Sequence, residues 1–376
     1  MNPRRSLQWL CWQPTPYNSY LFRALAEAPD IDLHVHFIAP VLASHPWGSS
    51  MLEGYPSRCY RILFGVDWHL LHLAVTDRGS LFVIAGWHDL TMQLVMTLLA
   101  LRGRPFVLWT DTPDLLTIRP RGKAFLRSAF LRWIFKRATS VLGTGQPAMQ
   151  ALSDMGCPKE KLVNFPFFVD LRRQAEPRRV PAERVKFVSS GRLKNEMKGH
   201  QIALSALALA REWSGSSNFE YVIAGAGPDL QALQDHTRRL HLERQVAFTG
   251  WLEPDAMAKL FAESHILLHP SLYDPFPVAV LEAMAAGLVV LGSDVCGSVR
   301  DRINNGVNGM IHHAGDVEEL AKQIAFVLSH PESVTAMSAR ARETAEQWPV
   351  SRGVAIIDSL LDEVCGPAVR NHVGRQ

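Results

Sequence analysis

The chain has few cysteines, and none of them stands in a pattern that binds metal. Its 376 residues include five, with no CxxC pair and no other metal-ligand spacing among them. This usage argues against a disulfide scaffold and a structural zinc site. We also expect no metal and no cofactor. Unpaired cysteines suit a reducing compartment, so we expect a cytoplasmic protein.

Long hydrophobic runs are also missing. The longest apolar stretch, LTMQLVMTLLAL at residues 90–101, is shorter than the roughly 20 residues that a membrane-spanning helix needs. At the N-terminus, Arg4 and Arg5 precede only the short run SLQWLCW, and Pro14 and Pro16 follow closely. This is not the pattern of a signal peptide. We expect neither a signal peptide nor an integral membrane protein.

The chain has only a small net charge, but its basic and acidic residues are unevenly distributed. Residues 1–170 hold 17 Lys and Arg against 12 Asp and Glu (+5), whereas residues 171–376 hold 22 against 24 (−2). The second half is thus slightly acidic, and the basic residues of the first half gather in one segment. This distribution argues against a nucleic-acid-binding protein.

Short β-branched or aromatic runs alternate with longer helical patterns, which indicates an α/β fold with parallel sheets. The chain is too long for one typical core, and Pro and Arg accumulate at residues 171–184. We therefore predict a first domain at 1–170, a linker at 171–184 and a second domain at 185–350. A helix at about 352–366 either completes the second domain or, as we expect, packs back on the first. The predicted strands cover residues 7–12, 31–37, 81–86, 105–110, 139–144, 161–166, 185–191, 219–227, 245–250, 265–270, 288–293 and 309–313.

Three loops at the ends of predicted strands in the second half carry unusual residues, and ligands bind at such strand ends in open parallel sheets. The first loop, SSGRLKNEMKGH at 189–200, places Arg192 and Lys198 near a helix N-terminus. Two cations there, together with backbone N–H groups, would hold a diphosphate. A solvated basic loop is the alternative interpretation.

The second loop, AGAGPDLQAL at 224–233, has Gly225 and Gly227, which permit a close backbone approach, and Pro228 at an expected helix start. By itself it is a weak signal, because such glycines often serve only a tight turn.

The third loop leads into a helix, in SLYDPFPVAVLEAMAAG at 271–287. Backbone N–H groups near Val278 could receive a phosphate or a sugar hydroxyl, and Asp274 and Glu282 could accept hydrogen bonds from hydroxyl groups. Alternatively, Asp274 caps a turn and Glu282 lies on the helix surface.

Residues 185–331 resemble the retaining glycosyltransferases of family 4, which have the GT-B fold of two Rossmann-like, doubly wound parallel-sheet domains facing a cleft. GRLKNEMKG is similar to that family's diphosphate motif, VIAGAGPDLQALQ to its G-x-G-P turn, and DPFPVAVLEAMAAG to its E-x7-E motif. The resemblance implies that the second acid, Glu282, binds the ribose and the first, Asp274, the donor sugar. The donor-binding residues implied are Gly191, Arg192, Lys198, Gly225, Gly227, Pro228, Asp274, Phe276, Pro277, Val278 and Glu282.

Three positions depart from the family pattern. Residue 274 is Asp where the family usually has Glu, and residue 277 is Pro where Gly is common, which removes one backbone N–H. The Gly-Gly pair that usually follows the next strand is Cys296-Gly297 here. The nucleotide half of the motif set is complete, and the departures fall on the sugar half.

In this family the first domain holds the acceptor. His88 and Asp89 stand where relatives often carry a His-acid pair, and Asp111 stands where they carry an important His. A structural His-Asp pair is the alternative to a catalytic role for His88. The first loop, WQPTPYNSY, lacks the glycine-rich turn that many relatives use for a phosphorylated acceptor.

The resemblance implies a hexosyltransferase without an enzyme nucleophile. The leaving phosphate, held by Arg192 and Lys198, would take the acceptor proton, and protein cations would replace a metal. The catalytic candidates are Arg192, Lys198, Asp274, His88 and Asp111. The expected partners are a nucleotide-sugar donor and a glycan or lipid-linked acceptor in cell-surface polysaccharide or glycolipid synthesis.

One segment, RPRGKAFLRSAFLRWIFKRA at 119–138, combines many cations with aromatic residues, and no acid occurs from 115 to 153. Such a helix is typical of contact with an anionic membrane surface. A helix with one buried stripe and a solvated basic face explains the pattern equally well. The residues expected at a membrane are Arg121, Lys123, Arg127, Trp133 and Lys136.

Two other functions remain open. A catalytically degenerate protein could bind nucleotide or glycan as a scaffold, which the changes at Asp274 and Pro277 would suit. A UDP-sugar epimerase of the same fold is the other, although its additional acidic and His motifs are not found.

Overall fold

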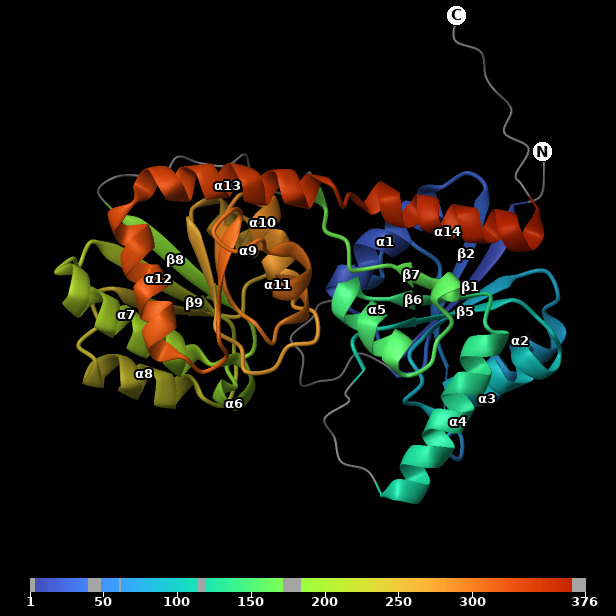
Figure 1. Cartoon of the computed structure of the whole chain (residues 1–376). Helices are drawn as coiled ribbons and strands as arrows, with labels where there is room; N and C mark the ends of the chain where they lie inside the picture. The colour runs from blue at the N-terminus through green and yellow to red at the C-terminus, as the bar shows by residue number, and fades with distance from the viewer. Residues whose placement is uncertain (1–3, 40–48, 61, 114–119, 172–183, 367–376) are drawn as a thin grey trace, which may run out of the picture. The chain divides into compact units, whose positions relative to one another are not determined.

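The structure, a computed structural model, describes residues 4–39, 49–60, 62–113, 120–171 and 184–366. The chain divides into two compact units. Unit 1 is Met1–Phe168 with Val350–Gln376, and unit 2 is Val169–Pro349. Residues 172–183, almost all of the predicted linker, lie outside the described residues. Figure 1 shows the elements of both units along the chain.

Within its described residues, unit 1 contains one parallel sheet with the strand order β3-β2-β1-β4-β5-β6-β7. Its strands are β1 (Arg5–Cys11), β2 (Ile31–Phe37), β3 (Ser57–Cys59), β4 (Leu81–Ala85), β5 (Phe106–Thr110), β6 (Ser140–Gly143) and β7 (Leu162–Asn164). Its helices are α1 (Pro16–Glu27), η1 (Ser49–Leu52), α2 (Trp68–Thr76), α3 (Leu90–Leu101), α4 (Arg121–Arg137), α5 (Gly145–Asp154), η2 (Lys159–Lys161) and α14 (Val350–Cys365).

Helices pack on both faces of this sheet, which is why its inner strands are nearly continuous apolar runs. Helices α2, α3 and α4 cover one face, where Met92 and Phe135 belong to a fully buried cluster. On the other face Trp9 packs edge-to-face against Phe22 of α1 and against Trp109, with ring centroids 5.4 and 5.5 Å apart. The C-terminal helix α14 packs on α1 and β1, so the end of the chain completes the unit that its beginning forms.

In unit 2 the described strands form a second parallel sheet with the order β10-β9-β8-β11-β12-β13. The strands are β8 (Val185–Ser190), β9 (Phe219–Ala224), β10 (Val246–Gly250), β11 (Ile266–His269), β12 (Val289–Ser293) and β13 (Gly309–His312). The helices are α6 (Asn195–Lys198), α7 (His200–Ser214), α8 (Leu230–Arg239), α9 (Pro254–Ala262), α10 (Val278–Ala285), α11 (Gly297–Arg302), α12 (Val317–Ser329) and α13 (Pro331–Glu346).

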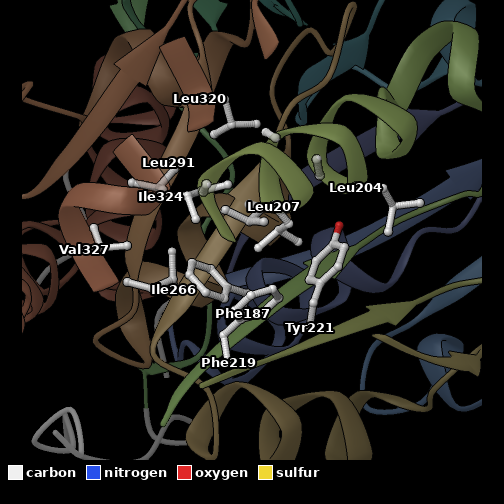
Figure 2. Packing of buried hydrophobic residues seen from close by; sticks show 14 of the residues in the cluster. Phe187, Leu204, Leu207, Phe219, Tyr221, Ile266, Leu291, Leu320, Ile324 and Val327 are labelled. Atoms are coloured by element: carbon white, nitrogen blue, oxygen red, sulfur yellow. The ribbon is translucent and has the colours of Figure 1, made fainter. Parts of the chain in front are cut away.

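The core of unit 2 has two layers, one on each face of the sheet. Figure 2 shows the layer under α7 and α12, in which Phe187 and Phe219 of the sheet meet Leu207 and Ile324 of the helices. On the opposite face, Val280 and Met284 of α10 pack with residues of α9, α11 and α13. This burial fixes the sheet and leaves its strand ends free to carry loops.

The predicted fold is confirmed: each unit is a Rossmann-like parallel sheet covered by helices, the architecture of the GT-B fold. Every predicted strand is present, within a few residues at its ends. The sequence did not predict β3, because this strand has three residues and lies at the sheet edge, with Arg58 and Cys59 exposed. An apolar pattern is absent there, since the strand buries almost nothing.

Candidate active site

The strand order of unit 2 indicates where on the sheet a ligand site is expected. From β8 the chain builds outward through β9 to β10, then returns to the other side of β8 and continues through β11 to β13. Strand order therefore reverses between β8 and β11, and in open parallel sheets ligands bind outside the carboxyl ends of the strands at such a reversal. The loops that follow β8 and β11 are the first and third predicted loops.

Backbone contacts join these two loops. The amide of Leu272 donates a hydrogen bond to the carbonyl of Met197 over 2.7 Å. Gly199 is left-handed, with φ of +62°, and a Cβ at this position would lie 2.2 Å from the carbonyl oxygen of Pro270. Only glycine permits this approach. The loop after β8 is therefore held against the loop after β11, with Lys198 at the contact.

The glycines of the second loop have a similar structural reason. A Cβ on Gly225 would lie 1.8 Å from the carbonyl oxygen of Gly191, and one on Gly227 would lie 2.4 Å from that of Leu193. The close approach predicted for them is thus an approach to the first loop. Asp229 strengthens it, because its carboxylate accepts a hydrogen bond from the amide of Asn195 over 2.6 Å.

One detail of the second loop was predicted wrongly. Pro228 does not start the helix, since α8 begins at Leu230 and Pro228 is an exposed residue of the preceding turn. In this turn, just before the helix begins, the side chain of Asp229 contacts the first loop.

Asp274 is the centre of the third loop. The residue is only 8% exposed, and its carboxylate forms an ion pair with Lys198. Nε2 of His269 lies 3.4 Å from the same carboxylate oxygen. Burial acts to raise the pKa of Asp274, but the hydrogen bond of His269 and the charge of Lys198 outweigh it, so this pKa lies below its usual value. The carboxylate is therefore ionised at neutral pH.

Residues 296–298, which include the altered Cys296-Gly297 pair, hold this loop in place. The amide of Gly297 donates to the carbonyl of Asp274 over 3.1 Å, and the hydroxyl of Ser298 donates to the carbonyl of Pro277 over 2.9 Å. Cys296 is fully buried and pairs with Asp274 in an isolated parallel bridge. Pro277 itself is the N-cap residue of α10, with φ of −63°. These contacts hold the loop although one amide is missing.

The other predicted donor-binding residues lie around this centre. Gly191 has φ of +146° at the start of the first loop, and Arg192 beside it is exposed. Val278 is the first residue of α10, and Glu282 follows one turn later on the same side, both half-buried. Phe276 is only 4% exposed and packs under Gly297. Its side chain supports the loop, so only its backbone remains for a ligand.

Two histidines at this site were not predicted. His269 is the last residue of β11 and only 4% exposed. His200 opens α7 directly after the Lys198 loop, and burial lowers its pKa to about 4. The signal for His269 was available, since a polar residue that ends an apolar strand run, as in HILLHP, lies where ligands bind.

The predicted acceptor residues lie in unit 1, where strand order reverses between β1 and β4. The ring of Trp12, in the loop after β1, meets the ring of His88, in the loop after β4, edge-to-face at 5.4 Å. The carboxylate of Asp89 caps α3, because its Oδ1 accepts hydrogen bonds from the amides of Thr91 and Met92. Asp111 is exposed at the end of β5, beside β4 in the sheet. His88 is exposed as well, so both predicted residues lie at the surface of unit 1.

Helix α4 divides into two halves. In its second half, Ile134 and Phe135 are fully buried and Trp133 packs partly against the same cluster. Its first half is exposed on nearly every side, with Phe125 72% and Leu126 68% exposed. Of the predicted membrane residues, Arg121, Lys123 and Lys136 are exposed, whereas Trp133 is half-buried. Arg127 lies over the ring of Trp87, 5.7 Å from its centroid.

The described residues contain no group of three or more His, Cys, Asp or Glu side chains that could hold a metal ion. Among the same residues, no helix has both the length and the apolar character to cross a membrane.

Comparison with known proteins agrees with the loops of unit 2. Residues 172–344 match the family model of glycosyl transferases group 1. The chain is 27% identical over 221 residues to the putative colanic acid biosynthesis glycosyltransferase WcaL of Escherichia coli, covering 57% of this chain and 53% of that protein. It is 35% identical over 112 residues to an uncharacterized glycosyltransferase of Methanocaldococcus jannaschii, 30% of this chain and 28% of the relative. The chain thus spans about half or less of these curated relatives.

Solved structures agree on the fold over nearly the whole chain. HepE of Anabaena, in complex with UDP, has a TM-score of 0.74 at 18% identity and covers 96% of this chain and 100% of its own. The same protein is also solved with UDP-glucose. A glycosyltransferase of Rickettsia africae has a TM-score of 0.76 at 14% identity, with 98% and 100% covered.

Proposed function

We propose, from the match to group 1 glycosyl transferases, that the protein is a retaining hexosyltransferase of family 4 that uses a UDP- or GDP-sugar. The observation that carries this proposal is the meeting of Lys198 and Asp274 at the strand reversal of unit 2. Exposed Arg192 lies on the same loop as Lys198. Together these residues offer cations to a diphosphate and a carboxylate to sugar hydroxyls.

In the proposed reaction, the protein positions the donor and stabilises the leaving diphosphate. Arg192 and Lys198 would bind the diphosphate, Glu282 on α10 would accept hydrogen bonds from the ribose, and Asp274 from the sugar. The departing phosphate oxygen takes the proton of the acceptor hydroxyl on the same face of the sugar, so that no protein nucleophile is required. Fixed cations supply the charge stabilisation, and we propose neither a metal nor another cofactor.

A thermal-shift panel with UDP, GDP and ADP tests the donor site, since a ligand stabilises the native state in proportion to affinity and concentration. We expect one of UDP and GDP to raise the melting temperature. Arg192→Ala should weaken its binding about tenfold or more, because a charge-assisted contact is lost. Lys194→Ala, a cation of the same loop paired with Glu196, is the matched control and should bind normally.

Hydrolysis of a panel of UDP- and GDP-sugars then separates the enzyme from its alternatives. Slow hydrolysis that Glu282→Ala reduces about tenfold supports a transferase. Binding of nucleotide with no turnover of any donor would favour the scaffold function. The Lys198–Asp274 ion pair is compatible with that function too. Interconversion of UDP-sugars would favour an epimerase.

We also propose a glycan or lipid-linked acceptor, bound near His88 and Asp111, and a place on the cytoplasmic face of a membrane. The first half of α4 supports this location, because Phe125 and Leu126 are exposed beside Arg121 and Lys123. Apolar side chains among cations suit an anionic bilayer surface. The five cysteines form no disulfide, which suits a reducing compartment. The product would be a cell-surface polysaccharide or glycolipid.

Co-sedimentation with liposomes tests the membrane proposal. The protein should bind vesicles that contain phosphatidylglycerol, and added salt should weaken this binding. Arg121→Glu with Lys123→Glu should abolish it, whereas Lys322→Glu, an exposed charge reversal in α12, should not. Binding that ignores both lipid charge and salt would refute the proposal.

A further inference from the structure

The buried carboxylate of Asp274 has two nitrogen partners, and both belong to fixed elements. Lys198 ends α6 and is half-buried, and its ammonium group forms the ion pair with Asp274. His269 ends β11, pairs with Gly292 in the sheet and places Nε2 3.4 Å from the carboxylate. The same ring nitrogen lies 3.2 Å from the hydroxyl of Ser271. The carboxylate is therefore held from two sides.

The backbone of Asp274 is fixed as well. Its carbonyl accepts from the amide of Gly297 over 3.1 Å, and Gly297 is itself pressed against the carbonyl of Pro275. The side chain thus has little freedom to leave Lys198 unless something replaces that contact. A buried carboxylate that loses its cation without replacement is costly, so Lys198 is not freely available to an incoming anion.

Ligands differ in what they offer to this pair. The diphosphate group of a nucleoside diphosphate brings only negative charge to this pair, so it competes with Asp274 for Lys198 and offers the carboxylate no replacement for that cation. A nucleotide sugar brings the same phosphates together with hydroxyl groups, which donate hydrogen bonds to Asp274 in place of Lys198. The Lys198–Asp274 pair therefore weakens the binding of the nucleoside diphosphate more than the binding of the nucleotide sugar.

We infer that Asp274 is an internal competitor for Lys198 and that His269 is the positioning residue that holds it there. The pair thereby makes the site prefer a nucleotide sugar to the nucleoside diphosphate that the reaction releases. This inference rests on the proposed donor site of unit 2 and adds to it a residue that selects donor over product.

Calorimetric titration with UDP and with UDP-glucose tests the inference; if the panel above selects GDP, GDP and GDP-mannose replace them. Asp274→Asn removes the competing charge, so UDP should bind about tenfold more tightly while the advantage of UDP-glucose over UDP disappears. A residue with only a structural role would weaken both ligands together, so the ratio of the two dissociation constants is the deciding quantity.

Two substitutions test His269. His269→Leu removes the ring nitrogen that holds Asp274 at Lys198, so UDP should bind more tightly and the preference for UDP-glucose over UDP should fall about tenfold. His269→Gln retains an N–H group at about the position of Nε2 and should restore most of the preference. In the Asp274→Asn background, His269→Leu should change neither dissociation constant by more than about twofold, because its action passes through Asp274.

The outcomes separate this inference from the proposed function. If UDP and GDP fail to bind, or if Arg192→Ala binds them normally, the proposed donor site is wrong. If a nucleotide binds through Arg192 but Asp274→Asn does not tighten it, the competition is refuted and the donor site stands. If His269→Leu has the same effect with and without Asp274→Asn, His269 is not the positioning residue. Thermal unfolding of each variant verifies that it is folded.

Discussion

At the scale of single residues, burial and neighbouring charges decide the charge state of the groups at the site. Arg192 is exposed, whereas His200 is 2% exposed and burial lowers its pKa to about 4. Asp274 is just as enclosed, yet its pKa is lowered because His269 and Lys198 act against burial. Two buried groups at one site thus stay in opposite charge states at neutral pH, one neutral and one ionised.

The neutral His200 makes unit 2 sensitive to acid. Its pKa is about 4 in the folded protein and near 6.5 in an unfolded chain, so the unfolded chain binds the additional proton as the pH falls from 6.5 to 4. The contribution of His200 to the free energy of unfolding is therefore fully present above pH 6.5 and is lost below it, by about 3 kcal/mol at most. His200→Leu should lose less unfolding free energy than wild type between pH 7 and 4.5, measured by urea denaturation.

The exposed His330→Leu is the control for that measurement. It should retain the acid sensitivity of the wild type. An identical loss of stability in His200→Leu and wild type would contradict the assignment. His36 of unit 1, whose pKa burial also lowers to about 4, keeps a second acid-sensitive step in every variant.

At the scale of elements, glycine residues allow the loops that follow neighbouring strands to pack closely against one another. Gly199 and Gly227 have no space for a side chain, because the backbone of the adjoining loop occupies it. The glycines of the sequence motif therefore align loops with one another, and the cations of the first loop acquire their positions as a result.

Gly227→Ala tests this role. The added methyl group would lie 2.4 Å from the carbonyl oxygen of Leu193 and 2.6 Å from its nitrogen, so one loop must move. We expect a loss of about 2 kcal/mol in unfolding free energy and weaker binding of UDP in the thermal-shift assay. Gly122→Ala, in α4 where nothing lies within 4 Å, makes the same chemical change and should lower neither quantity. Normal UDP binding by Gly227→Ala would refute the role.

At the scale of the whole molecule, the two ends of the chain form one unit. Arg5 at the start of β1 is 8% exposed and pairs with both Asp358 and Asp362 of α14. A residue 353 positions away in the sequence thus holds the last helix. Unit 1 is therefore incomplete until α14 has been synthesised.

Arg5→Met should loosen α14 and destabilise unit 1 by about 2 kcal/mol, less than a fully buried pair would cost because the two carboxylates are partly exposed. Hydrogen exchange followed by mass spectrometry should show faster exchange in α14 and α1, with α7 and α12 of unit 2 unchanged. Arg340→Met, an exposed pair within α13, is the control. Equal acceleration in both units would contradict the prediction.

Gly353→Ala tests the same docking by packing. A Cβ at this position of α14 would lie 2.6 Å from Cε2 of Phe168 and 3.0 Å from Cδ1 of Leu21. Alanine favours helix by about 1 kcal/mol over glycine, so an isolated helix would gain stability. We nevertheless expect a lower melting temperature for unit 1, because the clash lies in its core. A rise in melting temperature would show that α14 is not tightly docked.

The sequence by itself determined the α/β class, nearly every strand and the identity of the charged loop residues. These follow from local information: apolar runs specify buried strands, and glycines and prolines specify turns. Local information failed at β3 and at Pro228, where a three-residue edge strand and a turn before α8 depend on neighbours far along the chain.

The tertiary structure alone decided which of those residues meet. Strand order places β8 beside β11, and this pairing brings Lys198 to Asp274 and His269 to the same carboxylate. It also decided that the second half of α4 is core while Phe125 and Leu126 are exposed. The physical reason is that burial and ion pairing depend on distance in space, and a parallel sheet joins segments that are remote in sequence.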